Sequence, residues 1–329
     1  MSDFRSRARR ALALLACVAL VAACTGGGGA GAYPTRDLNV MAPAAPGGGW
    51  DSTARALSQA MKDGGVTNRN ITVYNREGAG GTVGLAEFVG KRGDPHEFMV
   101  MGLVMLGAIV TNKSPVNLDQ VTPLAALTTE WEAIAVAADS EYQTFQDLVD
   151  AFKADPEAVP LGGGSAGGTD HIVVGLIAKA AGVDPTQINY VPHSGGGELT
   201  PAILSGAVKA GISGASEFAD QVEAGEMRLL AVTSDAAIEG IDAPTIKESG
   251  LDVVQANWRG VVGPPGLSDA DKQSAVALIQ KLHDSDAWKA ALDQNGWQDF
   301  FKPGDEFGTY LGQERTKVEG ILKDIGLAE

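Results

Sequence analysis

The chain has 329 residues, of which 25 are basic and 41 acidic, and a formal net charge of −16 at pH 7. A field of this sign repels nucleic acid and anionic lipid headgroups, so it argues against a nucleic-acid partner. With 43 glycines and only 6% aromatic residues, the composition is that of a globular α/β protein with many tight loops, long enough for two domains.

The amino end has the features of an export signal. Residues 1–23 combine a basic segment with an apolar run, and small residues precede Cys24 as in the lipobox of bacterial lipoproteins. We therefore predict a lipoprotein signal peptide over 1–23, lipidation at Cys24 and a glycine-rich tether over 24–35. Removal of 1–23 leaves 21 basic and 40 acidic residues, a charge of −19. The mature chain is then expected to be exported and held by its lipid to the outer face of the cell membrane, or to the periplasmic side in a double-membrane bacterium.

From residue 36 onward, short apolar runs alternate with helical patterns, which is typical of βα units around a mostly parallel sheet. In the first half of the chain, we expect strands at 37–43, 71–75 and 97–105 and helices at 51–61 and 82–91. Further on, we expect strands at 158–161, 188–192 and 208–212 and helices at 169–181 and 198–204. Two long β-rich runs are expected to cross between two lobes, and the carboxyl end to form two or three amphipathic helices; these segments are 122–138, 251–265 and 268–327.

Several of these helices begin at a glycine-rich turn. Such a turn exposes backbone N–H groups and the positive end of the helix dipole, which together bind an anion. Four turns fit this description, at 46–53, 78–84, 162–171 and 193–200. None carries the lysine of a phosphate-binding loop, so we expect no nucleotide and no other cofactor. A small carboxylate needs few donors and suits such turns better.

A hydrolase is an alternative to a carboxylate-binding protein, because Gly163, Ser165 and Gly167 match the G-x-S-x-G motif of a nucleophile elbow. A serine nucleophile also needs a base, and the chain offers four histidines: His96, His171, His193 and His283. The HGGG oxyanion motif of such enzymes is absent, and the histidines lack the flanking ligands of a zinc site. We therefore expect neither catalysis nor a metal, while a hydrolase that uses Ser165 stays open as an alternative.

Charged residues near the expected cleft are few. Glu130 and Glu132 flank Trp131 in the first crossing run, where they either reach the cleft or form a solvated face; the solvated face is the simpler interpretation. If binding proves steeply salt-dependent, the first cations to test are Arg55, Arg76 and Arg259.

The order of several motifs along the chain is a specific signal, although each motif alone is weak. The series runs through "APGGGWD", "NREGAGGTVG", "GSAGGTDH", "YVPHSGGGELTPAILSGAVKAGISG", "AGEMRLLAVTS", "APTIKESGLDV" and "WRGVVGPPGLS". From about residue 37 to 326, the chain resembles the substrate-binding receptors of tripartite tricarboxylate transporters, the TctC or Bug family. The resemblance implies a two-lobed periplasmic-binding-protein fold of type II, in which each lobe is a mostly parallel sheet flanked by helices and the ligand cleft lies between the lobes. The first lobe would comprise 36–130 and 252–329, and the second 131–251.

The family's ligand-binding positions carry over residue by residue. In the first lobe they are Gly48, Gly49, Trp50, Asp51, Ala79, Gly80, Gly81 and Thr82. In the second lobe they are Ser165, Gly168, Thr169, His171, Ser194, Gly195 and, less directly, Ser216.

The chain departs from the family pattern at four places. Trp50 replaces a small hydroxyl residue, Glu77 replaces a proline, His193 and Ser194 replace tyrosine and lysine, and 103–106 is apolar. These changes favour a ligand with a carboxylate at one end and less polar bulk elsewhere, against Trp50 and Met105.

The resemblance implies a monomeric solute-binding lipoprotein and no enzyme. Such a protein captures a di- or tricarboxylate, or a related organic acid, and delivers it to the large and small membrane subunits of a tripartite tricarboxylate transporter. A receptor that signals the same ligand to a membrane sensor is an alternative that the residues leave open.

Overall fold

The computed structural model describes residues 33–193 and 196–328. The chain falls into two units, Met1–Arg36 and Asp37–Glu329, and the helices and strands given below belong to the second. The predicted signal peptide, Cys24 and most of the tether lie outside the described residues. Within the described part, no helix is both long enough and apolar enough to span a membrane.

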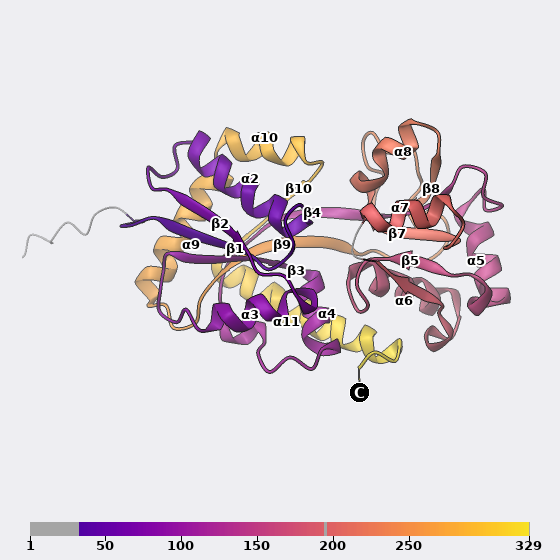
Figure 1. Ribbon diagram of the computed structural model, residues 1–329, viewed down its shortest axis with the longest axis horizontal. Helices are drawn as coiled ribbons and strands as arrows, with labels where there is room; N and C mark the ends of the chain where they lie inside the picture. Colours follow the sequence, from indigo (N-terminus) through magenta and orange to yellow (C-terminus); the bar gives the residue numbers. More distant parts are fainter. Residues whose placement is uncertain (1–32, 194–195, 329) are drawn as a thin grey trace, which may run out of the picture. The chain divides into compact units, whose positions relative to one another are not determined.

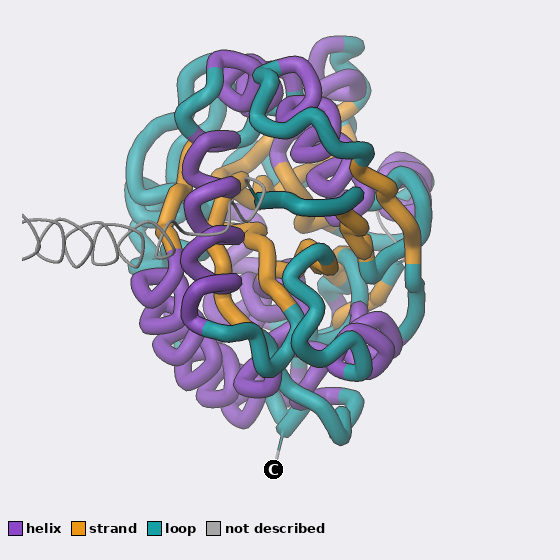
Figure 2. The backbone as a smooth tube through the Cα atoms, turned by 90° about the vertical axis from the view of Figure 1, so that its left-hand side faces the viewer, coloured by secondary structure: helices purple, strands orange, loops and turns teal. Residues whose placement is uncertain are grey.

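The first lobe is built on a sheet whose outer strands run parallel. These are β1 (Leu38–Ala42), β2 (Ile71–Asn75) and β3 (Glu97–Gly102), with β1 in the middle. Each strand leads into a helix: α2 (Gly49–Asp63), α3 (Thr82–Val89) and α4 (Leu103–Thr111). Figure 2 shows strands lying between helices, and β3 is buried along its whole length, as a strand covered on both faces should be.

Two long strands run from one lobe to the other (Figure 1). They are β4 (Thr122–Ala137) and β9 (Ala256–Gly263), which pair antiparallel, and β9 also pairs antiparallel with β3. The first half of β4 additionally pairs with β10 (Gln298–Pro303). Its second half pairs with β7 (Ala210–Gly214) and β8 (Met227–Val232) in the second lobe. One strand therefore belongs to both sheets.

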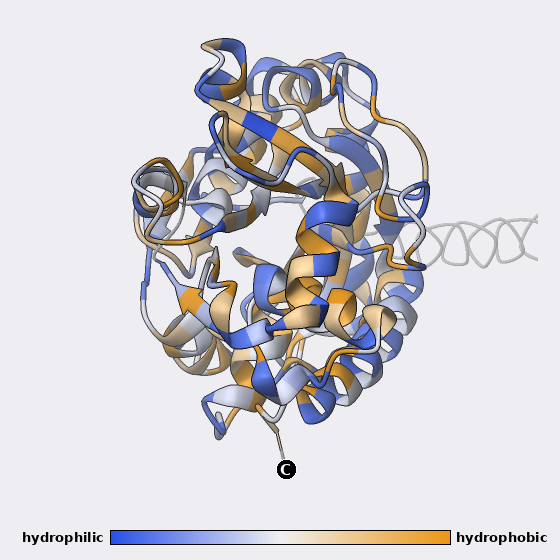
Figure 3. Cartoon of the chain, turned by 90° about the vertical axis from the view of Figure 1, so that its right-hand side faces the viewer, coloured by the Kyte–Doolittle hydropathy of each residue, from blue (hydrophilic) through white to orange (hydrophobic). Residues whose placement is uncertain are grey.

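The second lobe continues from β7 through two short parallel strands, β5 (Leu161–Gly163) and β6 (Tyr190–Pro192). Its helices are α5 (Phe145–Ala154), α6 (Thr169–Ala181), α7 (Gly196–Leu204) and α8 (Ala219–Glu223). Apolar side chains of α5 and α6, such as Phe145, Phe152 and Val173, pack against Ile134 and Ile212 of the sheet. Hydrophobic and hydrophilic residues are interspersed along the helices (Figure 3).

The carboxyl end returns to the first lobe as α9 (Asp269–His283), α10 (Asp286–Gln294) and α11 (Gly304–Asp324). These helices pack against β4, α2 and α4 respectively. The end of α11 also reaches α6, where Lys179 forms an ion pair with Asp324. A Cβ on Gly175 would lie 2.4 Å from the Cγ2 atom of Ile325, so the two helices approach closely at that point.

The predicted two-lobed α/β fold is confirmed, with local differences. The sheets are mixed rather than mostly parallel, because the crossing strands run against the outer ones. The strand expected at 97–105 ends at Gly102, and Leu103 already begins α4. Strand β5 starts where the strand expected at 158–161 ends, and β10 interrupts the helices expected over 268–327. The lobe boundaries proposed from the sequence stay a prediction.

The lobes meet where α4 faces the loop before α6. A Cβ on Gly107 would lie 1.9 Å from the carbonyl oxygen of Gly167, and one on Gly167 would lie 2.4 Å from Thr111 Cγ2. Gly167 also has a φ of +76°, which favours glycine. Two glycines therefore let the backbones of the two lobes touch.

Substitution of Gly107 tests this contact. Gly107→Ala should destabilise the fold by about 1–3 kcal/mol, because a carbonyl oxygen occupies the place of the new methyl group. Gly312→Ala is the matched control in α11, where nothing lies within 4 Å of the added Cβ; it should stabilise by about 0.5–1 kcal/mol. Urea unfolding of both variants measures the difference, and equal effects would mean that the lobes do not meet at Gly107.

Candidate functional site

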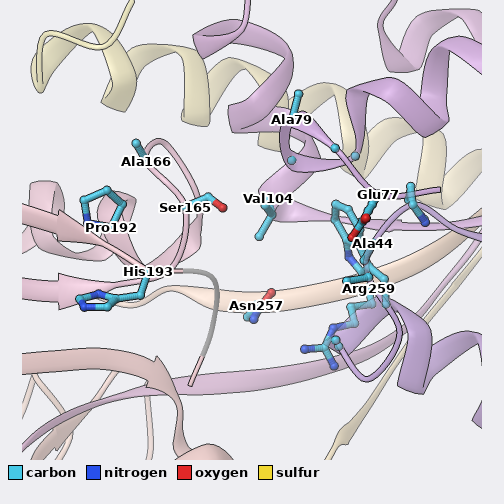
Figure 4. Close-up of a pocket in the computed structure, with 18 of the residues that line it drawn as sticks. Ala44, Glu77, Ala79, Val104, Ser165, Ala166, Pro192, His193, Asn257 and Arg259 are labelled. Atoms are coloured by element: carbon cyan, nitrogen blue, oxygen red, sulfur yellow. The ribbon is translucent and has the colours of Figure 1, made fainter. Parts of the chain in front are cut away.

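A cavity of about 680 Å³ lies between the lobes. The first lobe contributes 43–45, 48–50, 77–81 and Val104; the second contributes Ser165, Ala166, Pro192, His193 and Glu198; and β9 contributes Asn257 and Arg259. In Figure 4 the hydroxyl of Ser165 points across the gap toward Val104, whereas the ring of His193 points away into the second lobe. The cavity is therefore walled by segments that are far apart in the sequence.

Four helices around this cavity begin without a side-chain cap. Helices α2, α3, α4 and α6 follow Gly48, Gly81, Gly102 and Gly168, which have no side chain to accept a hydrogen bond from the first turn. By contrast α5, α9 and α10, whose first turns do not line the cavity, are capped by Thr144, Ser268 and Ser285. The uncapped α8 and α11 do not line it either. The helix dipoles of these glycine-led starts favour an anion in the cavity, most directly at α2 and α4, whose first turns line it with Gly49, Trp50 and Val104.

Glycines also make room for Trp50 in the cavity wall. A Cβ on Gly81 would lie 2.6 Å from Cζ3 of the Trp50 ring, and one on Gly102 would lie 3.1 Å from its Nε1. Gly81 has a φ of +90°, a left-handed conformation that a side chain would strain. Met105 packs on the same glycine and is fully buried. It therefore does not border the cavity, although the sequence predicted that it would. Val104, the residue before it, does.

Asp51 holds the first-lobe loop in place instead of facing the cavity. Its Oδ2 accepts hydrogen bonds of 2.9 Å from the Gly47 amide and from Arg55 Nε, and its Oδ1 accepts one of 2.9 Å from Asn75 Nδ2. Burial raises the pKa of Asp51, but the hydrogen bonds from Arg55, Gly47 and Asn75 outweigh this and lower it to about 2. Asp51 is thus an ionised support of the loop.

The second-lobe loop has two similar supports at the start of α6. Asp170 Oδ2 accepts a hydrogen bond of 2.5 Å from the Gly164 amide, and His171 Nδ1 accepts one of 3.2 Å from the Gly167 amide. The His171 ring is buried and stacks on Tyr190 with 3.9 Å between ring centroids. Burial lowers the pKa of His171 to about 4, so its ring is neutral and Nδ1 stays an acceptor. His171 therefore supports the loop from behind the cavity wall, and its predicted ligand contact stays a prediction.

The structure separates the residues predicted for the site into four groups. Those that line the cavity are Gly48, Gly49, Trp50, Ala79, Gly80, Gly81 and Ser165. Those that lie behind its wall are Asp51, Thr82, Gly168, Thr169 and His171. Ser216 lines a second cavity of about 650 Å³ that shares Gly48, Gly49 and Arg259 with the first. Ser194 and Gly195 lie outside the described residues.

Thr82 and Thr169 show why a hydroxyl residue beside a glycine need not line the cavity. Thr82 Oγ1 donates a hydrogen bond of 2.9 Å to the carbonyl oxygen of Ala79, within its own turn. Thr169 is 2% exposed and belongs to the packed side of α6. A hydroxyl at a helix start satisfies local acceptors or packs inward as readily as it faces a ligand.

Arg259 is the cation that borders both cavities. A Cβ on Gly49 would lie 2.6 Å from its Nη2, so the guanidinium rests against the first turn of α2. Its buried carboxylate partner is Glu130 on the neighbouring strand β4. Arg55 and Arg76 instead pair with Asp51 and Glu87.

Two acidic residues of β4 correct a prediction. Glu130 is 8% exposed and Glu132 has no exposed surface, so they do not form the solvated face that we expected. Glu130 Oε1 accepts a hydrogen bond of 3.2 Å from Asn257 in addition to its contact with Arg259. The crossing strands therefore carry buried charge at the base of the cleft.

The described residues give no catalytic pair for Ser165. The lone pair of His171 Nδ1 is already used by the Gly167 amide, and the His193 ring points away from the cavity. No hydrogen bond joins Ser165 to a histidine of the described chain. Among those same residues, no cluster of three histidine, cysteine, aspartate or glutamate side chains is arranged to hold a metal ion.

A pH series tests the role of His171. The unfolded chain binds a proton at this residue below about pH 6.5, while the folded chain excludes it until about pH 4. The free energy of unfolding therefore decreases as the pH is lowered through this window. Wild type should lose on the order of 1–3 kcal/mol between pH 7 and 4 relative to His171→Gln, whose amide oxygen accepts from Gly167 without titrating. Urea unfolding at several pH values measures this, and parallel curves for the two proteins would contradict the assignment.

Comparisons with known proteins establish the family of the chain. The family model described as the tripartite tricarboxylate transporter family receptor, TctC, matches residues 53–327. Among curated relatives, protein BugT of Bordetella pertussis is 24% identical over 311 residues, which cover 89% of this chain and 90% of the relative.

Solved structures show the same fold. MatC of Rhodopseudomonas palustris with bound malate is 21% identical, with a TM-score of 0.73 over 90% of this chain and 100% of that one. A second R. palustris protein, with adipate, is also 21% identical, with a TM-score of 0.78 over 90% of this chain and 99% of that one. Because the family match spans most of the chain and the fold agrees, this protein belongs to the TctC family of tripartite tricarboxylate transporter receptors.

Proposed function

We propose that this chain is an extracytoplasmic solute-binding protein that captures a small organic acid between its lobes and delivers it to the membrane subunits of a tripartite tricarboxylate transporter. The observation that carries the proposal is the set of four uncapped, glycine-led helices around one cavity. The first-turn amides of α2 and α4, which line the cavity at Gly49, Trp50 and Val104, need an acceptor, and a carboxylate supplies one with a favourable charge. Members of the family are receptors rather than enzymes, which fits a site that holds its ligand unchanged.

The cavity surface favours an acid with an apolar body. Trp50, Val104, Pro192 and several alanines line much of it, and Arg259 is the one arginine or lysine among the described residues that line it. A carboxylate placed at the first turn of α2 would meet both the amides of that turn and the Arg259 guanidinium. The malate and adipate held by the two R. palustris proteins are acids of suitable size for such a cavity. We therefore place the carboxylate anchor in the first lobe, near Gly49.

Attachment through Cys24 would keep the receptor close to its membrane partner. A flexible glycine-rich tether of about ten residues has an end-to-end distance of about 17 Å. That reach lets the two lobes contact a transporter in the same membrane while a single lipidated residue prevents loss of the receptor. The export signal, the lipid and the monomeric state belong to this proposal.

A thermal-shift screen tests the ligand class. Di- and tricarboxylates, aromatic acids and amino acids should include at least one compound that raises the melting temperature, because a ligand that binds only the folded chain stabilises it. The gain is about 2.7 kcal/mol at 100 times the dissociation constant. Methyl esters or amides of the same compound serve as the control and should give no shift. A screen in which no carboxylate stabilises the protein would contradict the proposed class.

Removal of the Arg259–Glu130 pair tests the anchor. Arg259→Gln alone would leave Glu130 buried without its partner, so the informative protein is the double variant with Glu130→Gln. Its affinity for the acid found in the screen should fall by about tenfold or more, the loss expected for one charge-assisted hydrogen bond. Arg76→Gln is the control, because Arg76 pairs with Glu87 away from the cavity; its affinity should stay within about twofold. Calorimetric titration decides, and an unchanged affinity in the double variant would exclude Arg259 as the anchor.

A further inference from the structure

Two carboxyl groups meet beneath the second-lobe wall of the cavity. Glu132 comes from the crossing strand β4 and has no exposed surface, while Asp170 comes from the first turn of α6 and is half-buried. The two side-chain carboxyl groups lie within hydrogen-bonding reach of each other, although neither Glu132 oxygen has an N–H or O–H donor among the described residues. Neither was needed to explain the cavity lining, because neither lines it.

Glycines of the second-lobe sheet leave space for acidic side chains around this pair. Gly214 stands opposite Glu132 in the pairing of β4 with β7, and a Cβ on it would lie 3.3 Å from the carboxyl carbon of Glu130. A Cβ on Gly163 would lie 2.6 Å from the Cβ of Asp170, so a side chain at Gly163 would displace Asp170.

Within the described part of the chain, the Glu132 oxygens have no hydrogen-bond donor other than the carboxyl that they face. The other charges around the pair are Glu130 on β4, Glu217 before α8 and Arg259 on β9, and Tyr190 on β6 is a further titratable group beside both carboxyls. Arg259 is already engaged by Glu130, and three of the four surrounding charges, with Asp170 included, are negative. A buried carboxylate without a donor is very costly, whereas a proton on one of the two groups turns the contact into a hydrogen bond.

We propose that Glu132 stays protonated at neutral pH and donates to the Asp170 carboxylate, so that a neutral acid on the crossing strand positions the second-lobe wall of the cavity. Asp170 in turn holds the loop, because its Oδ2 accepts a hydrogen bond of 2.5 Å from the Gly164 amide. Ser165 and Ala166, which follow directly, line the cavity. Glu132 is thus a positioning residue that acts through Asp170.

The surroundings of the pair shift both groups in the required direction. Burial raises the pKa of Glu132 well above its usual range, and the charges of Asp170, Glu130 and Glu217 raise it further against the effect of Arg259. Burial also raises the pKa of Asp170 to about 7, although the hydrogen bond from Gly164 lowers it. Asp170 therefore ionises first and becomes the acceptor, and Glu132 retains the last proton of the pair.

Loss of that last proton at alkaline pH would place two negative charges in contact under the loop. The Asp170 carboxyl would then move away from Glu132, and the Gly164 amide would lose its fixed acceptor. The effect on ligand affinity rests on the proposed function, whereas the protonation of Glu132 does not.

The decisive measurement counts protons in the full-length chain. Between pH 7.5 and 8.5, the slope of the unfolding free energy against pH gives the difference in bound protons between folded and unfolded states. Folded wild type should bind at least one proton more than Glu132→Gln, because the glutamine amide donates to Asp170 without titrating. Equal slopes would overturn the proposal.

Asp51→Asn is the matched control. Asp51 also holds a loop amide at a helix start, but Arg55 and Asn75 donate to it and its pKa is lowered to about 2. Because Asp51 is ionised in both states above pH 7, this variant should keep the wild-type slope. A slope that falls in Asp51→Asn as much as in Glu132→Gln would assign the effect to any loop-bound carboxylate and overturn the specific role of Glu132.

A second measurement needs no variant to fold. The carbonyl carbon shift of the Glu132 carboxyl in ¹³C-labelled wild type should report a protonated acid at pH 7.5, and an ionised shift would overturn the proposal. With adipate as the probe, the affinity of wild type should fall once Glu132 ionises, by about tenfold for each unit by which adipate binding raises the pKa of Glu132. The affinity of Glu132→Gln should stay constant. If adipate binds neither protein, the acid found in the thermal-shift screen takes its place as the probe, and the proton count decides the role of Glu132 independently of the proposed function.

Discussion

The cavity depends on helix starts that have no cap of their own. Every helix leaves its first amides without an intrahelical acceptor, and at α5, α9 and α10 serine or threonine side chains supply one. At α2 and α4, whose first turns line the cavity, Gly48 and Gly102 stand in the capping position and supply none. The missing acceptor is left to whatever enters between the lobes, which is why a small anion suits this space.

The polar side chains beside those glycines serve the loops rather than the ligand. Asp51 and Asp170 each accept an amide of the loop that precedes their helix, at Gly47 and Gly164. Their neighbours differ, because Asp51 is surrounded by donors while Asp170 faces another acid. The first lobe thus holds its loop with a permanent charge, and the second holds its loop with a hydrogen bond that requires a proton.

Helix starts and glycine turns were predictable because their signals are local. The predicted helix at 169–181 has the bounds of α6, and Gly48, Gly80 and Ser165 line the cavity as their loops suggested. The direction of single side chains was not predictable. His171 and Asp51 stand beside glycines in the sequence, yet they turn inward, since the path of the loop brings its own amides within their reach. Strand β10 was missed because its partner β4 lies far away in the chain.

The residues alone were enough to indicate an α/β receptor with glycine-led anion sites, since hydrophobic period, turn chemistry and motif order are all encoded within short segments. The charges at the base of the cleft needed the folded chain. Glu130 and Arg259 are 129 positions apart, and they meet because β4 and β9 run side by side between the lobes. Glu132 and Asp170 come from a crossing strand and from the first turn of α6, and they meet only after β4 has paired with β7 and α6 has packed on the second-lobe sheet. Burial and neighbouring charge set the protonation of such groups, and both arise only when distant strands are packed together.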